Sequence, residues 1–132
     1  DIIIKKPAEL IKEAVDVFVP CAVGSAITHN NISRLHCKAV IGGSNNQLED
    51  ETLATKLLER NILYAPDYIV NAGGLISVVH EYENETIDEM LIHEKLLHIK
   101  QSLRSIFEES RVTNTSTIAV ARSIAERIYK LT

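Results

Sequence analysis

The segment YAPDYIVNAGGLISVV (Tyr64–Val79) is a hydrophobic run that an asparagine, Asn71, and two glycines, Gly73 and Gly74, interrupt. A strand needs neither an amide side chain nor glycines in its course. A backbone that passes close to a ligand gains from glycine, because glycine has no Cβ to hold the ligand away. We therefore expect a strand over residues 62–70 that ends at Asn71, with a ligand against the turn that follows.

Two upstream segments repeat this order of an apolar run followed by small or amide residues. Residues 15–20 read VDVFVP and precede CAVG, and residues 39–43 read AVIGG and precede SNNQ. Apolar, β-branched runs of this length are typical of strands covered on both faces of a parallel sheet. Helical patterns over residues 7–14 and 51–61 and a helical turn over 31–38 accompany the three runs. This alternation predicts an α/β fold with a parallel sheet.

In such a sheet the carboxyl ends of the strands lie at one edge, and ligands bind in the crevice outside them. Amide side chains there can both donate and accept hydrogen bonds. We therefore expect the residues after the three runs to converge on one crevice: Cys21, Ala22, Asn45, Asn46 and Asn71. Taken singly, each segment fits a simple turn equally well.

The second half of the chain has a helical pattern. Apolar residues recur at spacings of three and four from Thr86 to Ser110, which predicts a long amphipathic helix. The residues TNTS (113–116) carry capping side chains, and a last helix is expected from about Thr117 to Lys130. We expect one unit of residues 1–132, with an α/β part to about residue 83 and a helical part from about residue 84.

The composition excludes several classes of protein. A net charge of −4 and a pI near 5.7 do not suggest nucleic-acid binding. The apolar runs are too short to cross a bilayer, so no membrane partner is expected. Two cysteines, Cys21 and Cys37, lack metal-ligand spacing and favour a reduced, cytoplasmic protein. His93 and His98 do not share a helix face, so no metal site is predicted.

The segments DVFVPCAVG, KAVIGGSNNQL and LYAPDYIVNAGGLISV, in this order and spacing, resemble the C-terminal part of the Glu/Leu/Phe/Val dehydrogenase family. Its branched-chain and aromatic members, the leucine dehydrogenases above all, are the most similar. The resemblance implies the C-terminal half of a Rossmann-type parallel sheet followed by long C-terminal helices. It also implies oxidative deamination of an apolar, for example branched-chain, L-amino acid to its 2-oxo acid, with NAD as hydride acceptor.

The resemblance assigns roles to particular residues. It implies that the backbone of Cys21 and Ala22 lies against the cofactor, and that Asn45 reaches the same region. Asn71 would contact both the nicotinamide and the substrate. Leu75 and Val78 would line the pocket for the substrate side chain, although core packing explains these two residues as well.

The sequence lacks other parts of the family pattern. We expect the catalytic lysine and aspartate of the N-terminal domain, and the first half of the dinucleotide fold with its G-x-G-x-x-G loop, to be absent. We therefore assign no catalytic residue and expect no turnover by the chain alone, which would act with the missing N-terminal part of the enzyme and in a homo-oligomer. Two other interpretations stay open: a non-enzymatic α/β interaction or oligomerisation module derived from such an enzyme, and a different nucleotide-binding protein with a similar crevice.

A half-sheet should leave an unpaired edge strand and an uncovered apolar face. We expect Val17, Val19, Val40 and Ile69 to be buried, with partners from the missing half or from a second copy.

Overall fold

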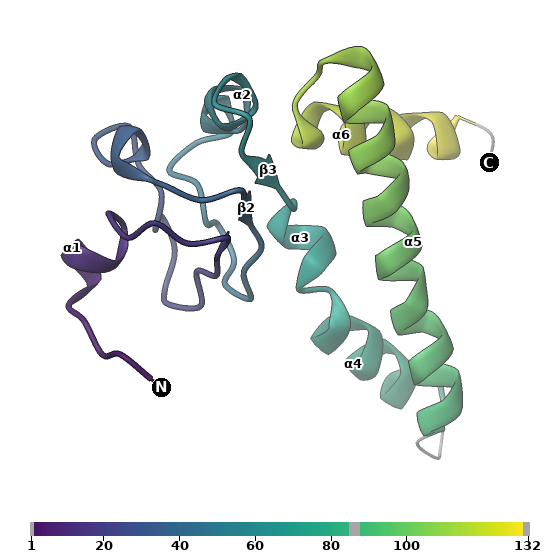
Figure 1. The fold of residues 1–132 in the computed structure, drawn as a ribbon. Helices are drawn as coiled ribbons and strands as arrows, with labels where there is room; N and C mark the ends of the chain where they lie inside the picture. Colours follow the sequence, from purple (N-terminus) through teal and green to yellow (C-terminus); the bar gives the residue numbers. More distant parts are fainter. Residues whose placement is uncertain (1, 85–87, 131–132) are drawn as a thin grey trace.

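A computed structural model describes residues 2–84 and 88–130 of the chain. The elements in chain order are α1 (Pro7–Leu10), β1 (Val17–Phe18), η1 (Ile32–Arg34), β2 (Ala39–Val40), α2 (Thr52–Glu59), β3 (Leu63–Tyr64), α3 (Asp67–Val70), α4 (Gly73–Glu83), α5 (Glu89–Thr113) and α6 (Thr117–Tyr129). Figure 1 shows a sheet-containing unit beside a helical arm, in which α5 runs back along α4 toward the sheet.

The three strands form one parallel sheet in the order β1-β2-β3. Phe18 pairs with Val40, and Val40 pairs with Tyr64. The expected α/β fold with a parallel sheet is therefore confirmed, although the strands are shorter than the apolar runs that predicted them.

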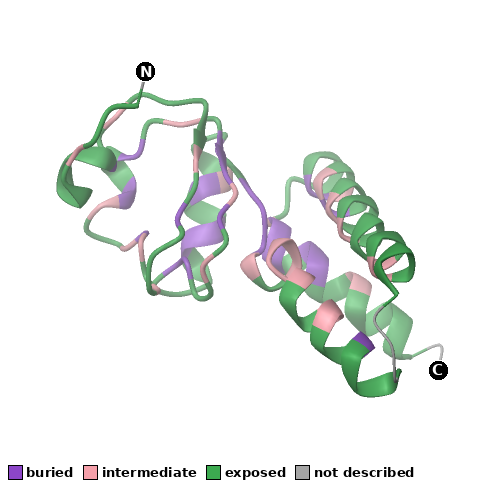
Figure 2. Ribbon diagram, turned by 90° about the horizontal axis from the view of Figure 1, so that it is seen from below, coloured by how far each residue is buried: buried purple, intermediate pink, exposed green. Residues whose placement is uncertain are grey.

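The core lies on the face of the sheet that α2 covers, where the predicted helix over 51–61 forms Thr52–Glu59. Val40 and Tyr64 point into it, and Leu53 and Leu57 of α2 are fully buried against them. Figure 2 shows buried residues gathered inside the unit that contains the sheet. A second, smaller cluster joins α5 and α6 through Ile106, Val120 and Ala121.

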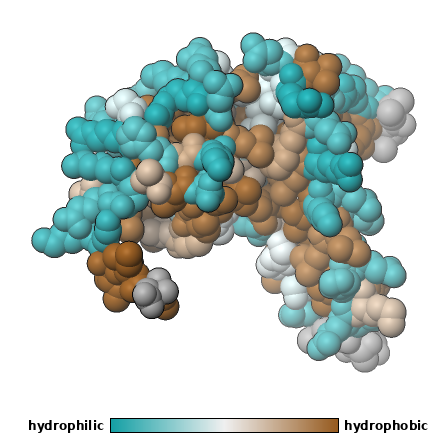
Figure 3. All heavy atoms as spheres, in the orientation of Figure 1, coloured by the Kyte–Doolittle hydropathy of each residue, from teal (hydrophilic) through white to brown (hydrophobic). Residues whose placement is uncertain are grey.

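The other face of the sheet is open. Val17 is 45% exposed and Val19 is 56% exposed, whereas Val40 is fully buried and Ile69 is half-buried. The expected burial is confirmed for Val40. Val17 and Val19 lie on the uncovered apolar face that was expected, and their burial by a partner stays a prediction. Figure 3 shows hydrophobic surface in the middle of the molecule, continuing onto the helical arm between hydrophilic margins.

The predicted strand over residues 62–70 is wrong beyond Tyr64. Ala65 N–H still donates to Val40 O at 3.0 Å, but Pro66 has no N–H with which to continue the ladder. Asp67 then accepts the N–H of Tyr68 at 2.8 Å, and a carboxylate in this position favours a helix N-terminus. Residues 67–70 are therefore helical, and Asn71 ends helix α3 rather than a strand.

Helices α5 and α6 follow the sequence pattern closely, whereas helix α4 was not predicted. The Asp88 carboxylate caps α5 by accepting the N–H groups of Met90 and Leu91 at 3.0 and 3.1 Å. At the expected break, Asn114 adopts a left-handed conformation and ends α5, and Ser116 caps α6. Thr86 and Ile87, which the prediction placed in the long helix, lie outside the described residues.

None of the described helices combines the length and the apolar character that crossing a membrane requires.

Candidate functional site

The loops that follow β1 and β2, which we call the first and second exits, pack directly against each other at the carboxyl edge of the sheet. Ser44, in the loop after β2, donates from its N–H and its hydroxyl to Pro20 O at 3.1 and 3.0 Å. Ser25 N–H donates to Asn46 O at 2.5 Å, and the Asn46 backbone is left-handed with φ of 52°. The loop that carries Cys21 and Ala22 is thereby held beside the loop that carries Asn45.

Gly42 permits this close approach. A Cβ built on Gly42 would lie 2.2 Å from Pro20 O and 2.6 Å from Pro20 Cδ, closer than real atoms come. A Cβ on Gly43 would meet only Cys21 Sγ, at an ordinary 3.7 Å. Of these two glycines, Gly42 is therefore needed for packing between the exits, and Gly43 leaves open surface beside Cys21.

The turn at Asn71, which we call the third exit, joins the other two through a pair of amides. Asn71 Nδ2 donates to Asn45 Oδ1 at 2.5 Å. The prediction that the segments around Ala22, Asn45 and Asn71 share one rim is thus confirmed, although Asn71 reaches the rim from the end of α3. We call Cys21, Ala22, Asn45 and Asn71 the rim residues; Asn71 is half-buried and the other three are exposed.

The amide pair leaves hydrogen-bonding groups for a ligand. Each asparagine side chain has one acceptor and one donor group, and the bond between them uses one of each. Within residues 2–84 and 88–130, Asn45 Nδ2 and Asn71 Oδ1 have no hydrogen-bond partner. One donor and one acceptor, side by side on an exposed rim of small residues, complement a carboxamide.

Gln47 and Asp67 hold the rim together, and the sequence analysis assigned neither a role. Gln47 is fully buried, and its Nε2 donates to Gly42 O at 2.8 Å and to Ser44 O at 2.9 Å. Its backbone N–H donates to Asp67 Oδ2 at 3.0 Å. The pair Pro66-Asp67, a signature of a helix start, could have indicated that Asp67 begins a helix; no sequence signal indicated its bond to Gln47.

Two further groups near the rim have shifted pKa values. Burial and then the negative charge of Asp67 raise the pKa of Tyr64 far above its ordinary value. Hydrogen bonds from the Thr52 hydroxyl and from His29 lower the pKa of Asp50 to about 2. The His29 Nε2 to Asp50 Oδ2 distance is 2.5 Å, and this contact joins the segment between β1 and β2 to the start of α2.

Leu75 and Val78 lie on α4, beyond the amide pair. They are three residues apart in a helix and so share a face, and they are 67% and 62% exposed. Core packing within this chain therefore does not explain them. His80, by contrast, is buried in the same helix, and its Nε2 accepts the N–H of Asp88 at 3.0 Å.

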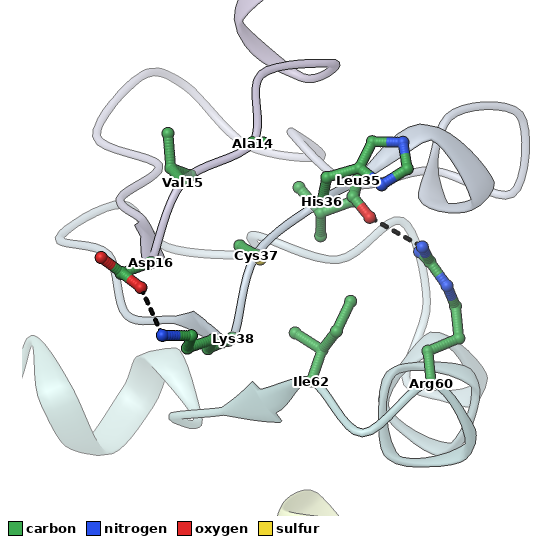
Figure 4. Close-up of a pocket in the computed structure, with 9 residues that line it drawn as sticks. All are labelled: Ala14, Val15, Asp16, Leu35, His36, Cys37, Lys38, Arg60 and Ile62. Carbon is green, nitrogen blue, oxygen red and sulfur yellow. Dashed lines mark hydrogen bonds and ion pairs between the residues drawn. The ribbon is translucent and has the colours of Figure 1, made fainter.

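A hollow of about 520 Å³ lies at the other end of the strands, between Asp16, Cys37 and Ile62 (Figure 4). Its charged groups already have partners: Lys38 pairs with Asp16 at 2.7 Å, and the Arg60 guanidinium donates to backbone carbonyls at Ile32 and Leu35. Burial raises the pKa of the Cys37 thiol, which disfavours the reactive thiolate. This hollow therefore offers less for recognition than the rim does.

The described residues contain no group of three or more His, Cys, Asp or Glu side chains that could hold a metal ion.

Comparison with known proteins decides the family. The model of the Glutamate/Leucine/Phenylalanine/Valine dehydrogenase family matches residues 2–127. The chain belongs to this family. The interpretation as a different kind of nucleotide-binding protein is thereby set aside.

Several curated relatives are amino-acid dehydrogenases. The chain is 42% identical over 118 residues to phenylalanine dehydrogenase of Lysinibacillus sphaericus, which is 89% of this chain and 30% of that enzyme. It is 37% identical over 123 residues to leucine dehydrogenase of Thermoactinomyces intermedius, which is 92% of this chain and 33% of that enzyme. The chain thus spans about a third of the length of the curated relatives that it matches.

Solved structures support the same relationship. The crystal structure of L-tryptophan dehydrogenase from Nostoc punctiforme superimposes with a TM-score of 0.86 at 38% identity, covering 92% of this chain and 36% of that one. A hetero-hexameric glutamate dehydrogenase from Thermus thermophilus shares the fold, with a TM-score of 0.74 at 20% identity, covering 96% of this chain and 32% of that one.

Proposed function

We propose that the chain forms the nicotinamide side of the cofactor site in an NAD-dependent dehydrogenase of apolar L-amino acids. The bond between Asn71 and Asn45 carries this proposal, because it joins distant segments into one rim with a free donor and a free acceptor. The carboxamide of nicotinamide has the complementary acceptor and donor. Relatives named for phenylalanine, tryptophan, leucine and valine favour an apolar amino acid, branched-chain or similar, as substrate.

In this proposal NAD, when bound, accepts the hydride that the amino acid loses. The chain's own residues bind and orient. Cys21 and Ala22 are exposed residues with short side chains, so the cofactor can approach their backbone. Asn45 and Asn71 fix the plane of the carboxamide, and Asn71 also faces the substrate. Leu75 and Val78 present an exposed apolar face on which a substrate side chain can pack.

Amine oxidation also needs a base and a cation to polarise the developing carbonyl. The rim consists of amides, a thiol and a methyl group, and it contains neither a cationic side chain nor a carboxylate, amine or imidazole that could act as the base. We infer that both groups come from an N-terminal part of the enzyme, that this chain alone has no turnover, and that the working unit is a homo-oligomer. Two unpaired cysteines favour a reducing, cytoplasmic location.

A chimera tests this proposal. Residues 2–127 would replace the matching third of the phenylalanine dehydrogenase of Lysinibacillus sphaericus, and NADH formation would be followed with leucine, valine and phenylalanine. We expect turnover in the chimera and about tenfold lower kcat/KM after Asn71→Ala, since a hydrogen bond to the ligand is lost. Asn30→Ala, at an exposed asparagine that is not one of the rim residues, is the matched control. A folded chimera in which both variants match the parent would contradict the proposal.

The second candidate function is a non-enzymatic interaction or oligomerisation module. Exposed apolar side chains on the arm, including Tyr82 at 91% and Met90 at 74%, favour it. Sedimentation velocity of the chain separates the two: a tight, specific oligomer together with an inactive chimera would support the module.

A further inference from the structure

The amide pair of the rim requires two loops to keep a fixed spacing. Asn45 and Asn71 lie 26 residues apart in the sequence. The strands do not set their spacing directly, because β2 ends at Val40 and β3 ends at Tyr64, well before either asparagine. Some other contact must therefore hold the two loops together.

Asp67 makes that contact from both its backbone and its side chain. Its carbonyl accepts the N–H of Asn71 at 3.0 Å, which fixes the end of α3. Its carboxylate accepts the N–H of Gln47 through Oδ2 at 3.0 Å, which fixes the loop after β2. One residue thus binds the backbone of Asn71 and the backbone two positions after Asn45.

The contact requires a carboxylate in particular. Oδ1 of Asp67 is occupied by the N–H of Tyr68 at 2.8 Å while Oδ2 is occupied by Gln47. An asparagine has one acceptor oxygen and one NH₂ group, so it can satisfy only one of the two N–H donors. The other donor would then face a second donor at hydrogen-bond distance.

The loop after β2, which contains Asn45 and Gln47, is held together by its own hydrogen bonds. The buried Gln47 side chain binds the carbonyls of Gly42 and Ser44 at 2.8 and 2.9 Å, so the loop folds around its own amide. A shift of the Gln47 backbone therefore moves Asn45 with it.

We propose that Asp67 is the positioning residue of the site: it sets the spacing of Asn45 and Asn71 without touching the cofactor. The consequence for ligand binding rests on the proposed function, whereas the consequence for the amide pair does not. Asp67 acts through hydrogen bonds to backbone N–H groups, so its removal should loosen the rim while the sheet and the α2 core persist.

The test compares Asp67→Asn with the wild-type chain by ¹⁵N NMR, without ligand, at a temperature where both are folded. We expect the side-chain amide signals of Asn45 and Asn71 to move toward those of free asparagine, and the Gln47 amide to exchange roughly tenfold faster. Asp16→Asn is the matched control, because it removes an exposed carboxylate at the opposite end of the sheet. Unchanged Asn45 and Asn71 signals in a folded Asp67→Asn chain would overturn the proposal.

A second measurement separates this inference from the proposed function. Nicotinamide mononucleotide is titrated into the wild-type chain and both variants. We expect about tenfold weaker binding to Asp67→Asn and unchanged binding to Asp16→Asn. If the wild-type chain shows no response at the rim, the proposed function fails while the ligand-free signals still decide the role of Asp67. Equal binding by Asp67→Asn and wild type would count against a positioning role. If Asp67→Asn does not fold, Asp67→Glu keeps the charge and tests the spacing with the same signals.

Discussion

The substitution Gly42→Ala tests how the first two exits are packed. The new Cβ would lie 2.2 Å from Pro20 O, whereas carbon and oxygen atoms normally stay about 3.3 Å apart. The two loops must therefore separate by about 1 Å. Ser44 then loses hydrogen bonds to Pro20 O that now measure 3.0 and 3.1 Å. Overpacking costs about 1–3 kcal/mol and two weakened hydrogen bonds add about 1–2 kcal/mol, so we expect a loss of about 2–5 kcal/mol in the free energy of unfolding.

Thermal and urea unfolding of the chain measure this loss. For a domain of this size, about 3 kcal/mol lowers the melting temperature by about 10 °C or more. Gly43→Ala is the matched control, since its Cβ meets only Cys21 Sγ at 3.7 Å, and we expect a change within about 0.5 kcal/mol. Gly42 has no left-handed backbone that would strain alanine by itself. Equal stability of Gly42→Ala and Gly43→Ala would therefore refute the packing argument.

Four further outcomes follow from the structure. Asp88→Ala removes the cap of α5 and should lower the free energy of unfolding by about 1 kcal/mol in urea titrations, with no loss if the cap is unimportant. Because folding lowers the pKa of Asp50 to about 2, the stabilising contribution of its carboxylate is present above about pH 4 and is lost as the pH falls toward 2. The melting temperature of the wild type should therefore exceed that of Asp50→Asn at pH 6, and the difference between the two should disappear as the pH falls toward 2. Because folding raises the pKa of Tyr64, the contribution of its neutral phenol to stability is present below about pH 10 and is lost as the pH rises further. Tyr64 should therefore not ionise in the folded chain, and the absorbance titration curves of Tyr64→Phe and wild type should coincide until the chain unfolds. In the chimera, Leu75→Ala shortens a side chain on the exposed apolar face of α4 and leaves more room for the substrate side chain. This should raise the ratio of kcat/KM for phenylalanine over valine by up to about tenfold. An unchanged ratio would show that Leu75 does not line the pocket.

The parallel sheet could be predicted from the sequence because its signal is local. The apolar runs before Pro20 and Gly42 are β-branched, and small residues follow each, so both the strands and their common edge were visible. The same reasoning failed after Tyr64. Hydrophobicity continues through Ile69 and Val70, but the missing N–H of Pro66 stops the ladder and Asp67 starts a helix.

The contacts that position the site were not predictable in the same way. Gln47 and Asp67 are 20 residues apart, and their bond depends on the spacing of two loops that no local pattern encodes. The exposure of Val17 and Val19 follows from the sheet's open face; the partner expected there stays a prediction. Asn45 and Asn71 could be predicted because their amide side chains follow apolar runs, which is a chemical signal that does not depend on the exact end of each strand.

The most direct test of the central claim is to map where nicotinamide mononucleotide lies on the chain. Intermolecular nuclear Overhauser effects would be measured between its nicotinamide ring protons and the labelled protein. The account predicts contacts with the Ala22 methyl group and the side-chain amides of Asn45 and Asn71. Ring contacts confined to the hollow beside Cys37 and Arg60, or no contact at the rim at saturating ligand, would contradict it.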